Sequence, residues 1–196
     1  MLILSSFGEF LPTIIIVAVV VILLIWGVGV YNKLVKARNQ VRNAWSQIDV
    51  QLTRRFDLIP NLVETVKGYA SHEKDIWEKF AAARNLYERA KAGNDVAQMS
   101  EANNQISSAL ARLMVVQEQY PELKANSNFQ TLMSELTETE DKISYTRQFY
   151  NDVALKYNNQ VEMFPGNIVA SMFKFKVAEY FNVTDEEERK APKVKF

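Results

Sequence analysis

The sequence predicts an all-α protein: an N-terminal transmembrane helix followed by an antiparallel, up-and-down bundle of four-helix type with a long, Pro-kinked first helix. Two observations lead to this prediction. Residues 11–31 contain no charged side chain, and residues 32–182 show the three-to-four-residue spacing of apolar side chains that is typical of amphipathic helices. Such helices, joined by short loops, bury their apolar stripes against one another. With 196 residues, the chain is long enough for one domain with a sizeable core.

The composition argues against several classes of protein. The chain has 23 basic and 23 acidic residues and a formal net charge of zero, whereas a nucleic-acid-binding protein needs an excess of Lys and Arg on one face. It has no cysteine, which excludes disulfides, thiolate metal sites, thiol nucleophiles and cysteine-linked lipid anchors. We therefore expect no nucleic-acid partner.

The uncharged stretch 11–31 predicts a membrane anchor in the lipid bilayer. At about 1.5 Å per residue, a helix of this length crosses a hydrocarbon core about 30 Å thick. Two aromatic rings lie toward its C-terminal end, where amphipathic rings favour the headgroup layer. The residues that we take as representative of the anchor are Ile14, Val21, Leu24, Trp26 and Tyr31.

The charges that flank the anchor predict its orientation. Basic residues without any acid follow it, at Lys33, Lys36, Arg38 and Arg42, whereas residues 1–10 contain only Glu9. The positive-inside rule then places residues 1–10 outside the cell and residues 32–182 in the cytoplasm, with the anchor in the inner (cytoplasmic) membrane. The alternative is a cleaved signal peptide, but the stretch lacks a basic start and an A-x-A-like cleavage site.

The first helix after the anchor is expected to be long. Its apolar stripe crosses Pro60 in phase, and residues 54–60 contain no glycine, so we predict one helix that is kinked at Pro60 and ends at 91–95, with Gly93 as a left-handed C-cap. The alternative is two helices, with Asp57 as the N-cap of the second and Pro60 in its first turn. The seven-residue series that carry the stripe are Leu34, Val41, Ile48; Trp45, Leu52, Ile59, Val66; and Phe56, Val63, Ala70, Trp77.

Periodicity also predicts the remaining elements. Helices are expected over about 96–119 and 128–162, with a loop over 120–128 because of its Pro, Asn and Ser content. FPGN (164–167) ends the second of these helices, and a last short helix follows over 168–181. A strand is the alternative for the FKFKV part of that segment, because its apolar residues alternate. The tail 183–196 is charged, contains proline and is expected to be extended.

Catalytic and metal-binding residues are not expected. His72 is the only histidine, whereas a carboxylate-bridged di-iron bundle needs two Glu-x-x-His motifs and zinc hydrolases need two or three His or Cys ligands. A hydrolase that uses Glu138 and Glu140 as a carboxylate pair is a weak hypothesis, because residues two apart on a helix point in different directions. We therefore predict no enzymatic activity, no cofactor and no metal site.

Polar residues near the apolar stripes form the candidate site, a polar core network at the Pro60 kink. The preferred interpretation is that this network fixes the helix register and stabilises the kink, a known use of buried polar residues. The alternative is a polar pocket of a ligand sensor. The five candidate residues are Asp57, Asn61, Glu140, Arg147 and Tyr150.

Three blocks of the sequence resemble the LemA family of bacterial membrane proteins. They are residues 31–74, residues 120–152, and FPGNIVASMF (164–173) with the closing Pro192, Val194 and Phe196. The resemblance implies a single N-terminal transmembrane helix, an outside N-terminus and a cytoplasmic helical bundle without established enzymatic activity. The genes of family members often lie near those of membrane-associated proteases, which suggests a role in the cell envelope.

These observations predict a non-enzymatic, membrane-anchored scaffold or adaptor of the bacterial cell envelope. We expect it to form homo-oligomers, because an anchor confines copies to two dimensions and GVGV (27–30) permits close helix approach. Other envelope or membrane-protease proteins are further candidate partners. The alternatives are a ligand sensor at the Pro60 kink and an accessory factor to a membrane protease.

Overall fold

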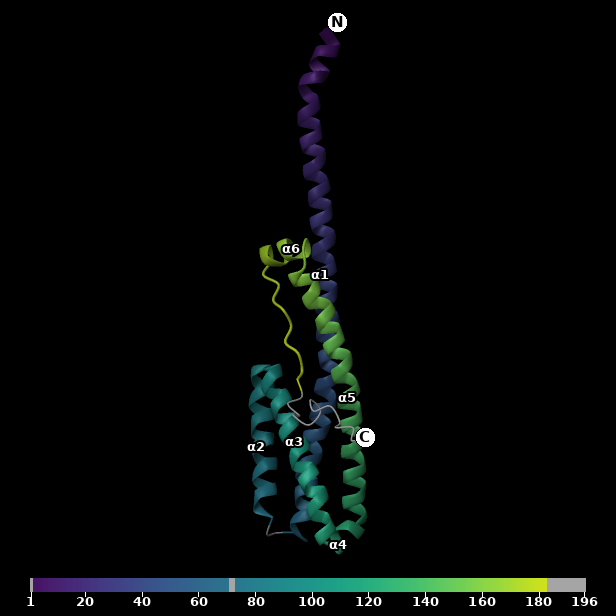
Figure 1. Cartoon of the computed structure of the whole chain (residues 1–196), viewed down its shortest axis with the longest axis vertical. Helices are drawn as coiled ribbons and strands as arrows, with labels where there is room; N and C mark the ends of the chain where they lie inside the picture. Colours follow the sequence, from purple (N-terminus) through teal and green to yellow (C-terminus); the bar gives the residue numbers. More distant parts are fainter. Residues whose placement is uncertain (1, 71–72, 183–196) are drawn as a thin grey trace, which may run out of the picture. The chain divides into compact units, whose positions relative to one another are not determined.

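The computed structural model of the chain is all-α over the part that it describes, residues 2–70 and 73–182, with side chains described from residue 12 onward. Six α-helices and one 3-10 helix account for most of these residues, and the described part contains no strand (Figure 1). This confirms the predicted fold class. The elements are α1 (Leu2–Lys67), α2 (Lys74–Gly93), α3 (Val96–Val116), η1 (Gln117–Gln119), α4 (Pro121–Ala125), α5 (Ser127–Glu162) and α6 (Gly166–Met172).

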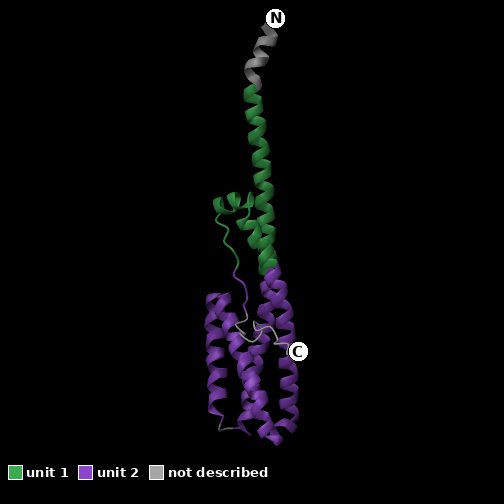
Figure 2. Ribbon diagram, in the orientation of Figure 1, with its two compact units in different colours: residues 1–42, 153–178 green, residues 43–152, 179–196 purple. Residues whose placement is uncertain are grey.

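The chain divides into two compact units. Unit 1 comprises residues 1–42 and 153–178, and unit 2 comprises residues 43–152 and 179–196 (Figure 2). Both α1 and α5 are continuous helices that contribute to each unit. The predicted tail 183–196 and His72 lie outside the described residues.

Unit 2 is a four-helix bundle. It consists of the C-terminal part of α1, helices α2 and α3, and the N-terminal part of α5, joined by short connections. Each of these long helices runs antiparallel to the one before it (Figure 1). Each helix turns an apolar stripe inward, as the periodicity predicts. The buried core side chains include Ile48, Leu52, Ile59, Leu62 and Val66 of α1, Ile76, Phe80 and Tyr87 of α2, Met99, Ile106 and Leu113 of α3, and Phe129, Leu136 and Ile143 of α5.

Helix α1 passes through Pro60 without a break but ends earlier than predicted. The alternative of a helix start at Asp57 is wrong, because residues on both sides of Pro60 are helical. The expectation that one helix continues to 91–95 is also wrong: α1 ends at Lys67, and the chain turns back before α2 begins at Lys74. The seven-residue series Phe56, Val63, Ala70, Trp77 hid this turn because Ala70, within the connection, is buried like the helical residue Phe56.

The connection between α2 and α3 uses a different cap from the one predicted. Gly93 is the last residue of α2, and Asn94 adopts the left-handed conformation, with φ 51°. Asparagine tolerates this conformation better than most residues. Asp95 then caps α3, because its carboxylate accepts a hydrogen bond of 2.9 Å from the Gln98 backbone N–H.

Two other segments differ from the prediction. The expected loop 120–128 contains the short helix α4, which places Pro121 at its first position, where proline is well tolerated. The expected helix 168–181 covers only 166–172. Residues 173–182 are neither helix nor strand, because α5 side chains bind several of their backbone groups.

Candidate functional site

The structure does not bring the five candidate polar residues together. Asp57 and Asn61 are exposed on α1, and Asn61 lines a shallow depression with residues of α5. Glu140 and Arg147 are half-buried on α5, and Tyr150 is buried near the other end of the bundle. Of the five, Glu140 belongs to the buried polar cluster described next.

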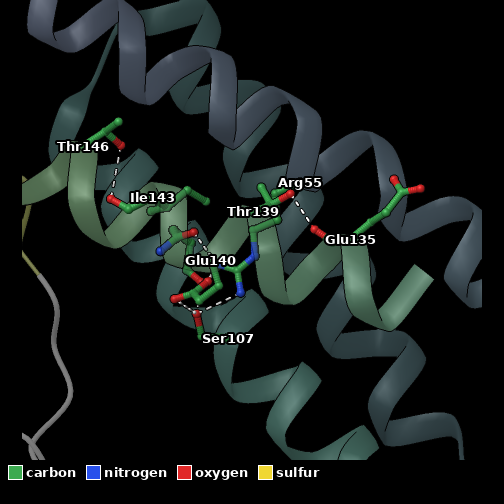
Figure 3. Close-up of polar contacts among 8 residues, drawn as sticks. Arg55, Ser107, Glu135, Thr139, Glu140, Ile143 and Thr146 are labelled. Carbon is green, nitrogen blue, oxygen red and sulfur yellow. Dashed lines mark hydrogen bonds and ion pairs between the residues drawn. The ribbon is translucent and has the colours of Figure 1, made fainter. Parts of the chain in front are cut away.

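Arg55 of α1 is the centre of a polar cluster inside the bundle of unit 2. Its side chain is only 1% exposed, and its guanidinium donates a hydrogen bond of 3.1 Å to Ser107 Oγ and another, of 2.5 Å, to Asn103 Oδ1 (Figure 3). The Glu140 carboxylate forms an ion pair with the same guanidinium at 2.5 Å. Three helices, α1, α3 and α5, therefore meet at one buried cation.

The electrostatics of this cluster are those of a structural ion pair. Burial lowers the pKa of Arg55, and the negative charge of Glu140 acts in the opposite direction. Arginine side chains stay protonated in proteins, so Arg55 is not suited to act as a general acid or base. An ionised arginine in a bundle core is tolerated when hydrogen bonds and an opposite charge surround it.

The spacing of the sequence indicates that Arg55 is buried, although Arg55 is not among the five candidate polar residues. Arg55 continues the seven-residue series from Ile48 to Leu62, and Asn103 stands between Val96 and Leu110 at the same spacing. Polar side chains at such positions face the core and need a partner there. Spacing alone could have identified Arg55 and Asn103 as buried, although it could not show that they contact each other.

The described residues do not assemble a metal site. Within residues 12–70 and 73–182, no group of three His, Asp or Glu side chains could hold an ion. The half-buried carboxylate of Glu140 is paired with Arg55. The Arg55 cluster is therefore suited to fixing the register of three helices.

A second polar system binds the C-terminal segment in unit 2. The Tyr150 hydroxyl donates a hydrogen bond of 2.7 Å to the Glu179 carbonyl. The Asn151 carboxamide bonds both backbone groups of Phe181, accepting from its N–H at 2.9 Å and donating to its carbonyl at 3.0 Å. Trp45 packs against the rings of Tyr150 and Phe181. Burial, followed by the Glu179 charge, raises the pKa of Tyr150 to about 12.

The same arrangement occurs in unit 1. The Tyr157 hydroxyl donates to the Lys176 carbonyl at 2.8 Å, and burial raises the pKa of Tyr157. The Asn158 carboxamide accepts from the Ala178 N–H at 2.7 Å and donates to the Ala178 carbonyl at 2.9 Å. Phe175, on the same segment, packs against the Arg38 guanidinium, whose central carbon lies 5.0 Å from the centroid of the ring.

The two systems use one repeated sequence pair. A Tyr-Asn dipeptide occurs twice on α5, at 150–151 and, seven residues later, at 157–158. A carboxamide offers a donor and an acceptor in the arrangement of a peptide group, so it can bind an extended backbone in the way that a neighbouring strand would. We call residues 176–182 the strap. The hydrogen bonds that hold it go to its backbone groups, and the buried Phe181 side chain adds a packing contact with Trp45.

An apolar groove lies between α1 and α2 at Pro60. Its volume is about 730 Å³, and its floor contains the buried side chains of Ile59 and Phe80. Trp77 forms part of the wall, and its indole N–H is buried without a hydrogen-bond partner among the described residues. Charges of both signs stand at the rim: Glu64, Lys67, Glu78 and Arg84. None of the five candidate polar residues lines this groove.

Comparison with known families identifies the chain. A family model described as the LemA family matches residues 44–196, which is most of the sequence. The chain belongs to the LemA family. This confirms the resemblance seen in the three sequence blocks.

Curated proteins similar to this LemA-family chain include a magnetosome protein and a LemA protein. The chain is 29% identical over 174 residues to magnetosome protein MamQ 1 of Paramagnetospirillum magneticum, an alignment that covers 77% of this chain and 64% of the relative. It is also 29% identical over 143 residues to protein LemA of Metamycoplasma hominis, with 73% of this chain and 64% of the relative covered. The chain thus spans less than two thirds of the length of these curated relatives.

The N-terminal part of α1 gives this LemA-family protein a membrane anchor. Its most apolar window has a mean hydropathy of 3.0, is long enough to cross a membrane and is not buried by any other part of the structure. The side chains of Ile14, Val21 and Leu24 are exposed, unlike those of a helix in a soluble core. Together with the family assignment, this indicates a membrane-associated protein.

Proposed function

We propose that this LemA-family protein is a non-enzymatic, membrane-anchored scaffold of the bacterial cell envelope that binds other helical proteins and copies of itself. The observation that carries the proposal is the groove at Pro60. Its apolar floor and mixed charged rim suit the apolar face of an amphipathic helix. The polar groups of the Arg55 cluster, in contrast, form hydrogen bonds and an ion pair with one another.

The anchor supports self-association. Gly27 and Gly29 of α1 have open space where a side chain would stand, so a second helix can approach closely there. Confinement to a membrane raises the effective concentration of copies. Partners from the envelope, including membrane proteases, would meet the same groove.

The proposal includes an orientation. The basic residues after the anchor support a topology with residues 1–10 outside, the anchor 11–31 in the inner membrane and residues 32–196 on the cytoplasmic side. Because the chain has no cysteine, single substitutions can report the topology. A membrane-impermeant maleimide should label Ser6→Cys but not Glu101→Cys in spheroplasts, and the reverse result would refute this orientation.

Site-specific photocrosslinking in cells tests the scaffold proposal. A photoreactive amino acid at Val63 or Ala81, both in the groove, should form discrete adducts with membrane proteins or with a second copy. The same amino acid at Asp141, an exposed position on α5, is the matched control. The proposal fails if the groove positions give the same products as the control.

A further inference from the structure

The segment that contains α6 leaves large apolar side chains exposed in unit 1. Phe164 is 79% exposed and Met172 is 69% exposed. An apolar surface of this kind on a folded protein marks a place where it contacts another apolar phase. We call this surface the α6 patch; its residues are Met163, Phe164, Ile168, Met172 and Phe173.

The other side of α6 attaches it to α1 where the anchor ends. Val169 and Ala170 are buried against Leu34 of α1, and the partly buried Val30 and Tyr31 pack on the same cluster. The rings of Tyr31 and Phe173 also meet, with 4.7 Å between their centroids. Figure 1 shows α6 lying crosswise to α1. A helix crosswise to a span that follows the bilayer normal runs parallel to the membrane plane, which is the orientation of interfacial helices.

The turn that leads into α6 is held in a fixed geometry. A side chain at Gly166 would clash with the carbonyl oxygen of Gln160, so only glycine fits this close approach of the backbone. The close approach brings the start of α6 back against the end of α5. The residues of the α6 patch therefore belong to a segment that is packed against α5 and α1.

The charges around the α6 patch match a bilayer surface. Residues 31–42 and 153–178, the part of unit 1 that follows the anchor, contain seven Lys and Arg residues and a single acid, Glu162. Lys33, Lys36 and Lys174 are exposed. Cationic side chains beside apolar and aromatic ones are typical of interfacial helices, because they meet the phosphate layer while the apolar groups enter the acyl region.

We propose that the α6 patch is a second membrane contact, which inserts into the leaflet from which α1 emerges. We assign the bilayer as the partner of the α6 patch because the same bilayer holds α1, and because α6 is packed on the residues at the end of the transmembrane span. Two contacts at one leaflet fix the tilt and rotation of unit 1 at the membrane, which a single helix leaves free. The inference goes beyond the scaffold proposal and depends only on the anchor.

Site-directed spin labelling of the full chain in nanodiscs that contain phosphatidylglycerol tests this proposal. The chain has no native cysteine, so Phe164→Cys and Met172→Cys can each carry one label. Leu155→Cys, an exposed position earlier on α5, is the matched control, and Val21→Cys in the anchor is the reference for the membrane interior. The measurement is the relaxation by oxygen, which concentrates in lipid, relative to that by a water-soluble nickel chelate.

We expect the oxygen-to-nickel ratio at positions 164 and 172 to exceed that at 155 by several-fold and to approach that at 21. In a chain that also carries Phe164→Asp, the ratio at 172 should fall toward the control. Equal ratios at 164, 172 and 155 would overturn the proposal. Protection of 164 and 172 from both reagents would also overturn it, by showing that a second copy or another protein covers the α6 patch. A low ratio at 21 would instead refute the anchor itself.

Discussion

The buried guanidinium of Arg55 and the carboxylate of Glu140 lie 2.5 Å apart and join the first and the last long helix of the bundle. The two side chains are unequally placed, because Arg55 is almost fully buried and the Glu140 side chain is 44% exposed. Loss of Arg55 therefore removes packing and leaves polar partners inside, whereas loss of the Glu140 charge leaves a buried cation without its counter-charge.

The first prediction concerns these two residues. Arg55→Met should lower the free energy of unfolding by about 2–4 kcal/mol, because Asn103 and Ser107 lose their donor inside the bundle. Glu140→Gln should cost about 1–2 kcal/mol, since its partial exposure weakens the ion pair. Urea denaturation of the chain in detergent, followed by circular dichroism, measures both changes.

The neighbouring ion pair gives a matched control. Arg54 and Glu135 lie 3.8 Å apart with both side chains more than a third exposed. Arg54→Met should cost less than about 1 kcal/mol, because exposed pairs contribute little. Equal losses for Arg54→Met and Arg55→Met would show that the buried cluster does not stabilise the bundle.

The second prediction concerns the strap. Asn158→Ala removes both hydrogen bonds to the Ala178 backbone and should cost about 1–3 kcal/mol locally. The Ala178 amide should then exchange with solvent about tenfold faster or more, which hydrogen–deuterium exchange measures. Asn159→Ala, at the next and exposed position, should leave this exchange rate unchanged. Unaltered exchange in both variants would mean that the carboxamide does not hold the strap.

The third prediction is an alkaline pH dependence. The pKa of Tyr150 is raised from 10.0 to about 12, so the folded state favours the neutral phenol more than the unfolded chain does. The stability from this group is fully present below pH 10 and is lost as the pH rises toward about 12. One proton per molecule corresponds to at most about 1.4 kcal/mol per pH unit.

Tyr150→Phe separates this effect from general alkaline unfolding. At neutral pH it should cost about 1 kcal/mol, because the hydrogen bond to the Glu179 carbonyl is lost. Above pH 10, its free energy of unfolding should fall less steeply than that of the parent chain. Tyr145→Phe, which removes an exposed hydroxyl from the same helix, is the control. Parallel pH profiles for Tyr150→Phe and the parent would contradict the assignment.

The fourth prediction concerns Pro60. A proline inside a helix cannot donate to the carbonyl four residues earlier, here that of Phe56. Pro60→Ala restores this donor and should raise the free energy of unfolding by about 1–3 kcal/mol. Glu64→Ala, on the rim of the same groove, serves as the control for surface changes. A loss of stability in Pro60→Ala would show that the pyrrolidine ring contributes more through its groove contacts than the hydrogen bond would.

Local pattern was sufficient to predict the helices and the anchor. The uncharged stretch 11–31, the periodic stripes and the bundle topology depend on residues close together in the sequence, where helix geometry fixes which side chains share a face. The same local reasoning failed at the end of α1. Its stripe continued in phase across the connection, because the chain reverses there while still burying Ala70.

What the sequence by itself determined was therefore an anchored, all-α chain of the LemA family with inward-facing stripes. Only the tertiary structure decided which polar groups meet. Arg55 finds Glu140 through the register between α1 and α5, and Asp57 and Asn61 are left exposed because they lie on the outer face of α1. The strap was beyond prediction for a further reason. The Tyr-Asn pairs of α5 bind its backbone groups, which every residue carries, so the strap's side chains do not record these hydrogen bonds.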